Sequence, residues 1–322
     1  MNSSCCNSSG LPVRDSFNAA LAKNLIVVLL CTGINYINSS LVFTFFQSQT
    51  FRENPRYVLF IHMVLNDMIQ LSIAGALHVV SYVFYTINVS LCCLLLMVAI
   101  FTTLNTPLNL AGMAVERYIA ICDPLRHSQI CTVRRTYTLI ALIWVGGALP
   151  ILPDLFVLLA TEPASFFHST ILCSRDYVFR HPYLLQKKNV SHMVYLSLVW
   201  LTLTYTYFRI LFAAKAASAD ARRARNTILL HAAQLLMCMF TYIGPLLDTL
   251  LLDIFPSHLL EIRFTSYLIV HILPRFLSPI IYGMRDQAFR KHLKHHLLCT
   301  ICLSRAPRRV SVKKHSANIP ST

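Results

Sequence analysis

The sequence predicts an all-α membrane protein: a bundle of seven transmembrane helices with its N-terminus outside and a short amphipathic helix after the seventh span. Composition is the first observation behind this prediction, because 56% of the 322 residues are hydrophobic and 13% are charged, whereas a soluble domain carries about 25% charged residues. The second observation is a set of seven apolar stretches, each long enough for a spanning helix of about 20 residues. The third is the unequal distribution of Lys and Arg between the connecting loops.

The seven apolar stretches lie at residues 24–47, 57–85, 91–120, 136–160, 190–214, 227–252 and 262–283. Turn-forming pairs such as Asn54-Pro55 and Asp123-Pro124 lie between them. The longest connection, at about 161–189, follows the fourth stretch. We therefore expect an N-terminal segment at 1–23, a helical domain at 24–283, an amphipathic helix at 284–298 and a C-terminal tail at 299–322.

Loop charges indicate the orientation, because Lys and Arg are found preferentially on the inner side of a membrane. With the N-terminus outside, the inner loops hold Arg52, Arg56, Arg126, Arg134, Arg135, Lys215, Arg222, Arg223 and Arg225, and the outer loops hold Arg175, Arg180, Lys187, Lys188 and Arg263. The inner loops are thus the more basic ones. The sequons at Asn2 and Asn7 fall outside in the same topology, and we expect both to be glycosylated.

The net charge of +15 does not indicate a nucleic-acid partner. The basic residues lie in short loops and in the tail, where anionic lipid of the inner leaflet explains them better. Between residues 289 and 297, apolar residues recur every four positions among basic ones. This pattern predicts an amphipathic helix on the membrane surface, followed by palmitoylation of Cys299 and Cys302.

A charged pair, Glu116 and Arg117, ends the third apolar stretch. Charges at membrane depth are costly unless they are paired or hydrated, so these residues are candidates for function. Cys92 precedes Arg117 by 25 residues, which is about 37 Å of helix against about 30 Å of hydrocarbon. Cys92 should therefore lie at the outer surface, where the longest loop contains one cysteine, Cys173. We expect a Cys92–Cys173 disulfide; pairing of Cys93 instead, or no disulfide, are the alternatives.

These features resemble a rhodopsin-like G-protein-coupled receptor. Residues 113–125, Met-Ala-Val-Glu-Arg-Tyr-Ile-Ala-Ile-Cys-Asp-Pro-Leu, are similar to the signature of odorant receptors, and residues 206–210, 223–231 and 277–282 resemble that family's motifs in helices 5, 6 and 7. The resemblance runs from about Asn38 to Phe289, and residues 273–279 are similar to fish-type odorant receptors. Two residues depart from the motifs: Ile228 replaces a cysteine, and Ser278 replaces an asparagine that offers more hydrogen bonds than a hydroxyl.

The resemblance implies that the inner end of the bundle switches G-protein coupling. In the family, the arginine pairs with the adjacent acid in the inactive receptor and moves on activation to meet the G protein and a tyrosine of helix 5. The corresponding residues here are Glu116, Arg117, Tyr118, Tyr207 and Tyr282. A ligand supports this change only by binding the open form more tightly.

The resemblance also implies an internal polar site at Asp67, to which we add Thr106, Arg275 and Ser278 from their positions in the predicted helices. Asp67 lies near the bilayer centre, where the acid of the family binds sodium. Arg275 lies at a depth that should face Asp67, and each charge otherwise lacks a partner in hydrocarbon. We therefore hypothesise that Arg275 pairs with Asp67 and replaces the sodium ion; the alternative is that Arg275 points into a wet cavity.

Ligand pockets of the family lie in the outer half of helices 3, 5, 6 and 7. The matching residues are Ile100, Thr103, Leu104, Ser191, Tyr195, Tyr242, Leu246, Thr249, Tyr267 and His271. This set is largely apolar and aromatic with a few hydroxyls, which suits a small organic molecule; bundle packing is the alternative role of each residue. Asp248 and His192 are further polar candidates for a charged odorant.

The resemblance implies an odorant receptor at the plasma membrane of sensory cilia. Its expected partners are a small-molecule odorant, membrane lipid and a heterotrimeric G protein of the olfactory type that raises cAMP. We recognise no catalytic set of side chains, and we expect no enzymatic activity, cofactor or metal site. A non-olfactory receptor of the same superfamily is the first alternative, and a channel or transporter, which would need an ionisable pathway or broken helices, is the second.

Overall fold

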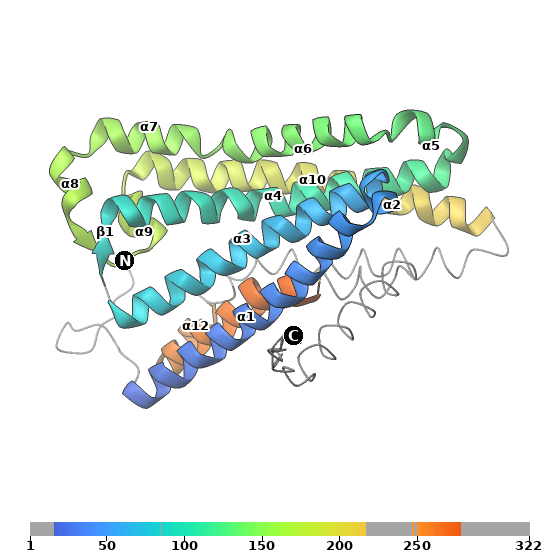
Figure 1. The fold of residues 1–322 in the computed structure, drawn as a ribbon. Coiled ribbons are helices and arrows are strands. Elements are labelled where there is room, and N and C mark those ends of the chain that lie inside the picture. The colour runs from blue at the N-terminus through green and yellow to red at the C-terminus, as the bar shows by residue number, and fades with distance from the viewer. Residues whose placement is uncertain (1–15, 85, 217–246, 248–249, 278–322) are drawn as a thin grey trace, which may run out of the picture.

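The computed structural model describes residues 16–84, 86–216, 247 and 250–277, whose arrangement is drawn in Figure 1. Several predictions made from the sequence fall outside these residues. They concern Asn2, Asn7, Tyr242, Leu246, Asp248, Thr249, Ser278, Tyr282, Cys299, Cys302 and the helix expected at 284–298.

Long helices make up most of the described chain. They are α1 (Phe17–Gln47), α3 (Pro55–Val83), α4 (Val89–Cys122), α6 (Val133–Ala148), α7 (Leu152–Thr161), α10 (Pro182–Ala216) and α12 (Leu259–Tyr267), which continues into a π-helix, η3 (Leu268–Ile272). Short elements connect them: α2 (Gln49–Arg52), α5 (Pro124–Ile130), α8 (Ala164–His168), α9 (Arg175–Val178), the 3₁₀-helix η2 (Pro256–His258) and the strands β1 (Ile87–Asn88) and β2 (Thr170–Ile171).

Five segments of the described chain are long and apolar enough to cross a membrane: Phe17–Gln47, Pro55–Val83, Val89–Cys122, Val133–Thr161 and Met193–Ala213. They coincide with the first five predicted spans. The predicted sixth span lies mostly outside the described residues. The seventh is described as far as residue 277 and begins at Leu259, earlier than the predicted residue 262.

Polar capping residues place the helix ends outside the apolar stretches. The side chain of Asn54 accepts a hydrogen bond from the backbone N–H of Arg56 at 3.1 Å, and Asn88 accepts one from Ser90 at 2.9 Å. Such caps satisfy the first amide groups of a helix, which have no partner inside it. As a result α4 begins directly after Asn88, before the predicted residue 91. Its other end, at Cys122, lies two residues beyond the predicted residue 120.

The predicted span at 136–160 consists of two helices rather than one. α6 ends at Ala148 and α7 begins at Leu152, with a turn between them. Pro150 and Pro153 cause the interruption, because proline lacks the N–H that an uninterrupted helix requires. The carbonyl of Pro150 accepts a hydrogen bond from Nζ of Lys187 at 2.9 Å, so the break also provides an acceptor for α10.

The helix α4 lies at the centre of the bundle and packs against α3, α6 and α10, while α1 packs against α3 (Figure 1). Buried apolar side chains such as Leu41, Met63 and Leu110 fill the space where α1, α3 and α4 meet. A second apolar cluster, which includes Leu158, Phe166 and Val178, packs around Cys92 and the short elements near it.

Four polar side chains join α3 to α4, and we call them the polar seam: Asn66, Gln70, Thr103 and Thr106. Nδ2 of Asn66 donates to Oγ1 of Thr106 at 3.1 Å, and Nε2 of Gln70 donates to Oγ1 of Thr103 at 2.6 Å. Polar groups inside a membrane must be satisfied by the protein itself. The polar seam therefore favours one register between the two helices.

His62 extends this hydrogen bonding to α6. Nε1 of Trp144 donates to Nε2 of His62 at 2.7 Å, and Nδ1 of His62 is 2.6 Å from Oδ1 of Asn109. Because an indole N–H only donates, Nε2 of the histidine must accept, and the ring proton lies on Nδ1. Trp144, His62 and Asn109 thus form one chain of hydrogen bonds across α6, α3 and α4.

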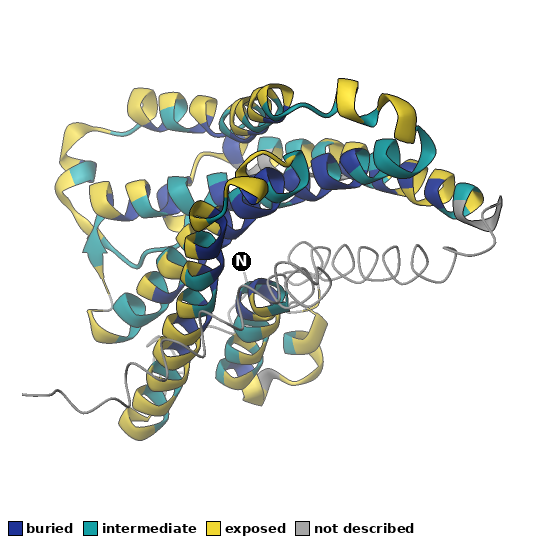
Figure 2. Cartoon of the chain, turned by 45° about the vertical axis from the view of Figure 1, so that its right-hand side comes forward, coloured by how far each residue is buried: buried dark blue, intermediate teal, exposed yellow. Residues whose placement is uncertain are grey.

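Large apolar side chains cover the outside of the bundle. Leu29 of α1, Leu142 of α6 and Leu201 of α10 are 61%, 63% and 68% exposed. Figure 2 shows that buried positions face one another between the helices, whereas exposed positions point outward. Lipid tails are as apolar as leucine, so such a surface is compatible with the hydrocarbon core of a membrane.

At one end of the bundle, the connection between α7 and α10 folds back over the start of α4. Strands β1 and β2 pair antiparallel, with Ile87 opposite Ile171. Cys92 and Cys173 form a disulfide, and Cys93 remains a buried free thiol. The predicted disulfide is thus confirmed. We call this the disulfide end and the opposite end of α4 the Glu116 end.

We predict that Gly147→Ala destabilises the bundle, with Gly33→Ala as the matched control. A Cβ at Gly147 would lie 2.1 Å from Oδ1 of the buried Asn105, whereas nothing lies within 4 Å of a Cβ at Gly33. Overpacking of this kind costs about 1–3 kcal/mol. Thermal unfolding of detergent-purified protein should show a lower midpoint for Gly147→Ala alone, and equal midpoints for both variants would contradict the packing described.

Candidate functional site

The Glu116 end contains an ion pair between α4 and α5. Glu116 is buried, and its Oε1 lies 3.1 Å from Nε2 of His127. Asp123 ends α4 and Pro124 begins α5, so the chain turns back and brings His127 to Glu116. Burial and the negative charge of Glu116 raise the pKa of the Cys131 thiol, which follows α5.

The partner that the structure shows for Glu116 is His127, a residue to which the family resemblance gave no role. Neighbouring residues of a helix point about 100° apart, and here the carboxylate of Glu116 is directed to His127. The expected pairing of Glu116 with Arg117 stays a prediction. The role of His127 could not be predicted, because this residue lies in a short connection whose path depends on the turn at Asp123-Pro124.

Tyr118 connects the Glu116 end to α10. Its ring lies 6.0 Å from the ring of Tyr205, and Cζ of Arg209 lies 6.0 Å from the Tyr118 ring. Tyr207, the helix 5 tyrosine expected in the switch, packs against Phe208 instead and is 38% exposed. Tyr205 and Tyr207 are two positions apart on α10, and Tyr205 makes the ring contact with Tyr118 of α4.

Both members of the proposed internal pair, Asp67 and Arg275, are buried, and each is 3% exposed. The guanidinium of Arg275 interacts electrostatically with the carboxylate of Asp67. Nη1 of Arg275 donates to the carbonyls of Val270 and His271, at 2.7 and 3.1 Å. These carbonyls belong to the π-helix η3, whose wider turns alter the regular hydrogen bonding of a helix.

Within the described residues, Oδ1 of Asp67 is buried without a hydrogen-bond partner. Thr106, expected beside Asp67, bonds to the adjacent Asn66 of the polar seam. Replacement of sodium by Arg275 therefore stays a prediction.

A cavity of about 30 Å³ lies near the disulfide end, between α4, α7 and α10. This is room for a small polar group. The described residues that line it are Ile100, Leu104, Pro150, Ile151, Asp154, Arg175, Lys187, Ser191 and Tyr195. The hydroxyl of Tyr195 donates to the carbonyl of Leu104, so the cavity wall joins α10 to α4.

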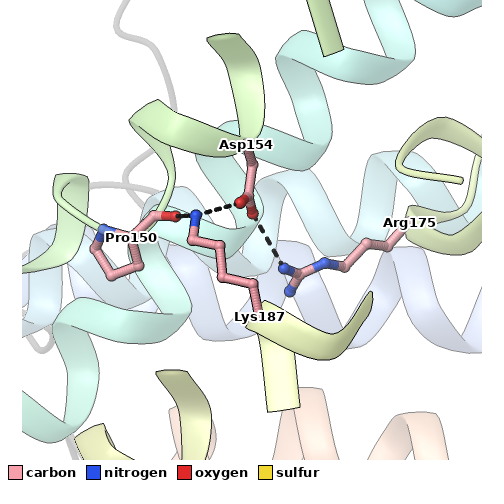
Figure 3. Close-up of polar contacts among 4 residues, drawn as sticks. All are labelled: Pro150, Asp154, Arg175 and Lys187. Carbon is pink, nitrogen blue, oxygen red and sulfur yellow. Dashed lines mark hydrogen bonds and ion pairs between the residues drawn. The ribbon is translucent and has the colours of Figure 1, made fainter. Parts of the chain in front are cut away.

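Three charged side chains meet at this cavity (Figure 3). Nζ of Lys187 lies 2.5 Å from Oδ1 of Asp154, and Nη2 of Arg175 lies 3.4 Å from Oδ2 of the same carboxylate. The side chain of Asp154 is 9% exposed, and those of Lys187 and Arg175 are 18% and 23% exposed. An aspartate this deeply buried requires such partners.

The structure brings together four of the residues predicted to bind ligand: Ile100, Leu104, Ser191 and Tyr195 line the cavity. Thr103 is part of the polar seam instead.

Tyr267 and His271 lie in a separate aromatic cluster. The ring of Tyr267 stacks on His78 at 4.6 Å and lies 5.4 Å from His271. Contact of any of these residues with a ligand stays a prediction.

The charged residues of the cavity were not recognised as a site from the sequence. Asp154 was hidden in an apolar stretch, and Lys187 and Arg175 were interpreted as loop charges that set the orientation. The one available signal was Asp154 itself, since an acid inside a membrane span needs a partner.

Comparison with known proteins identifies the relatives of this chain. A sequence model described as 7 transmembrane receptor (rhodopsin family) matches residues 37–282. Odorant receptor 131-2 of Danio rerio is 31% identical over 285 residues, which are 87% of this chain and 87% of that protein. Olfactory receptor 4E2 of Mus musculus is 27% identical over 58% of this chain and 62% of its own length. Neurotensin receptor type 1 of Rattus norvegicus is 41% identical over 56 residues, 17% of this chain and 13% of that protein.

Together with the apolar outer surface of the bundle and the polar seam inside it, these matches define a multi-pass membrane receptor. The chain belongs to the rhodopsin family of seven-transmembrane receptors, whose members couple a ligand to a G protein, and within that family it belongs with the odorant receptors.

We predict that His127→Ala raises ligand-independent signalling several-fold. The substitution leaves the buried carboxylate of Glu116 without the partner seen here, and an unpaired buried charge favours a rearrangement that hydrates it. Ligand-independent cAMP, normalised to receptor at the cell surface, is the measurement. His168→Ala removes an exposed histidine and is the control. Equal signalling by both variants would show that the pair does not restrain the receptor.

Proposed function

We propose that this receptor binds a small extracellular odorant within its helix bundle and activates a heterotrimeric G protein of the olfactory type, raising cAMP. The similarity to Odorant receptor 131-2 over 87% of both chains carries the proposal. The geometry supports it, because α4 lines the cavity with Ile100 and Leu104 and holds Glu116 near its other end. One helix thus joins the place for a ligand to the place for a G protein.

The proposed orientation puts the disulfide end outside the cell and the Glu116 end inside. Disulfides persist in oxidising compartments, which supports an outer position for Cys92 and Cys173. The loop charges support the same orientation. The receptor is then placed in the plasma membrane, with sensory cilia as the expected location, and with Asn2 and Asn7 outside and Cys299 and Cys302 inside.

Activation requires that the ligand bind the active arrangement more tightly than the inactive one. Two contacts between α4 and α10 suit such coupling: the Tyr195 hydroxyl on the Leu104 carbonyl beside the cavity, and Tyr118 against Tyr205 and Arg209. A ligand that shifts α10 at the cavity would change the second contact as well. Arg117, Tyr207 and Tyr282 keep the switch roles that the family resemblance gives them.

A non-olfactory receptor of the rhodopsin family is the second candidate. The match to Neurotensin receptor type 1 has the higher identity, 41%, but it covers 17% of this chain. A match this short supports the shared family and not a shared ligand.

We predict that Arg117→Ala reduces odorant-evoked signalling at least tenfold, by about 1.4 kcal/mol or more of coupling free energy. The matched control is Arg126→Ala, which removes an exposed arginine of α5 at the same end of the bundle. The readout is cAMP in cells that contain an olfactory-type G protein, exposed to a broad odorant panel, with surface receptor quantified. Undiminished signalling by Arg117→Ala would overturn the assigned switch.

A further inference from the structure

The cavity at the disulfide end carries charges that a site for a neutral odorant does not need. Asp154 comes from α7, Arg175 from α9 and Lys187 from α10. Three separate elements therefore deliver charged groups to one place, and Figure 3 shows all three side chains converging. The family resemblance assigned none of them to ligand binding.

The carboxylate of Asp154 is already occupied. Lys187 contacts one of its oxygens and Arg175 the other, at 2.5 and 3.4 Å. A ligand amine would have to compete with two cations for a side chain that is 9% exposed. Asp154 therefore acts as an anchor for the two basic side chains rather than as a receptor for a cation.

Lys187 keeps donor capacity for a further acceptor. An ammonium group has three N–H donors. Within the described part of the chain, two of them are accounted for by Asp154 and by the carbonyl of Pro150 at 2.9 Å. Lys187 lines the cavity together with both of these partners, so its third donor can reach a molecule bound there.

The charge balance of the described cavity lining is positive. Arg175 and Lys187 supply two positive charges and Asp154 one negative charge, which leaves +1. Both cations of the lining can only donate hydrogen bonds, so they favour a ligand group that accepts them. An anionic ligand group that accepts from the third donor of Lys187 forms the strong type of hydrogen bond, in which both partners are charged.

We propose that this cavity binds the carboxylate group of a small, otherwise apolar organic acid. The carboxylate accepts hydrogen bonds from Lys187 and from the hydroxyl of Ser191, and the apolar part of the acid packs on Ile100, Leu104 and Ile151. The cavity of about 30 Å³ has room for the carboxylate, so the apolar part of the acid must displace apolar side chains of the lining. This inference rests on the proposed receptor function and names its ligand class.

The test uses compounds that differ only in their polar group. Straight-chain monocarboxylates of three to twelve carbons are compared with the primary alcohols and primary amines of the same lengths. The full-length receptor is expressed with an olfactory-type G protein, and cAMP is measured. In parallel, thermal stabilisation of purified receptor reports binding without signalling. We expect an acid to act at a concentration at least about tenfold below its alcohol and amine, as for loss of a charge-assisted hydrogen bond.

Variants then test the assigned residue. Lys187→Met should raise the effective concentration of the acid at least about tenfold and change that of the alcohol less than about threefold, whereas Lys187→Arg should retain the response to the acid. The control, Arg180→Met, removes a positive charge from the same connection; Arg180 is exposed and stacks over Phe166, away from the cavity lining. If Lys187→Met fails to reach the surface, Lys187→Met combined with Asp154→Asn removes the ion pair as a unit and should show the same selective loss.

The outcomes separate the two proposals. Activation by alcohols or amines without preference for acids overturns the carboxylate site and leaves the receptor function standing. Stabilisation by acids without any cAMP response supports the site and overturns the assigned G-protein coupling. The carboxylate site is overturned if no acid produces either stabilisation or a cAMP response. It is also overturned if the response to the acid is unchanged in Lys187→Met.

Discussion

A polar group inside a membrane bundle must find its partner within the protein, and this constraint decides how α4 is held. Asn66 and Gln70 of α3 bond to Thr106 and Thr103 of α4, and His62 joins Asn109 to Trp144 of α6. Apolar contacts alone would tolerate sliding, since lipid competes for them equally well. Directional hydrogen bonds do not tolerate it, so they fix the helix that carries Cys92 at one end and Glu116 at the other.

The same constraint links the break in the fourth span to the charged cavity. Two prolines interrupt the helix between α6 and α7, and the carbonyl of Pro150 accepts from Lys187. One turn later Asp154 reaches the same ammonium group and Arg175. A continuous helix would have kept the carbonyl of Pro150 in its own hydrogen-bond ladder. The break therefore helps to hold α10 against α4. Tyr195, Tyr205 and Arg209 of α10 are held in place with it.

The spans and the disulfide could be predicted because they depend on local composition and on length. Apolar stretches of the required length report directly on membrane crossing, and 25 residues of helix between Cys92 and Arg117 place the cysteine at the opposite surface. The pairing of Glu116 with His127 could not be predicted, since it depends on where a seven-residue helix, α5, turns after Asp123. The cluster at Asp154 was missed for a related reason: its members are far apart in the sequence and meet only when α7, α9 and α10 are packed.

The proposed mechanism requires that the cavity between α4 and α10 be the ligand site, at the opposite end of the bundle from the G protein. A cryo-electron microscopy structure of the receptor with an activating monocarboxylate and a G protein tests this most directly. The account predicts a carboxylate within hydrogen-bond distance of Nζ of Lys187 and the G protein at Arg117. A carboxylate bound elsewhere, such as beside Tyr267 and His271 with Lys187 still held only by Asp154 and Pro150, would contradict it.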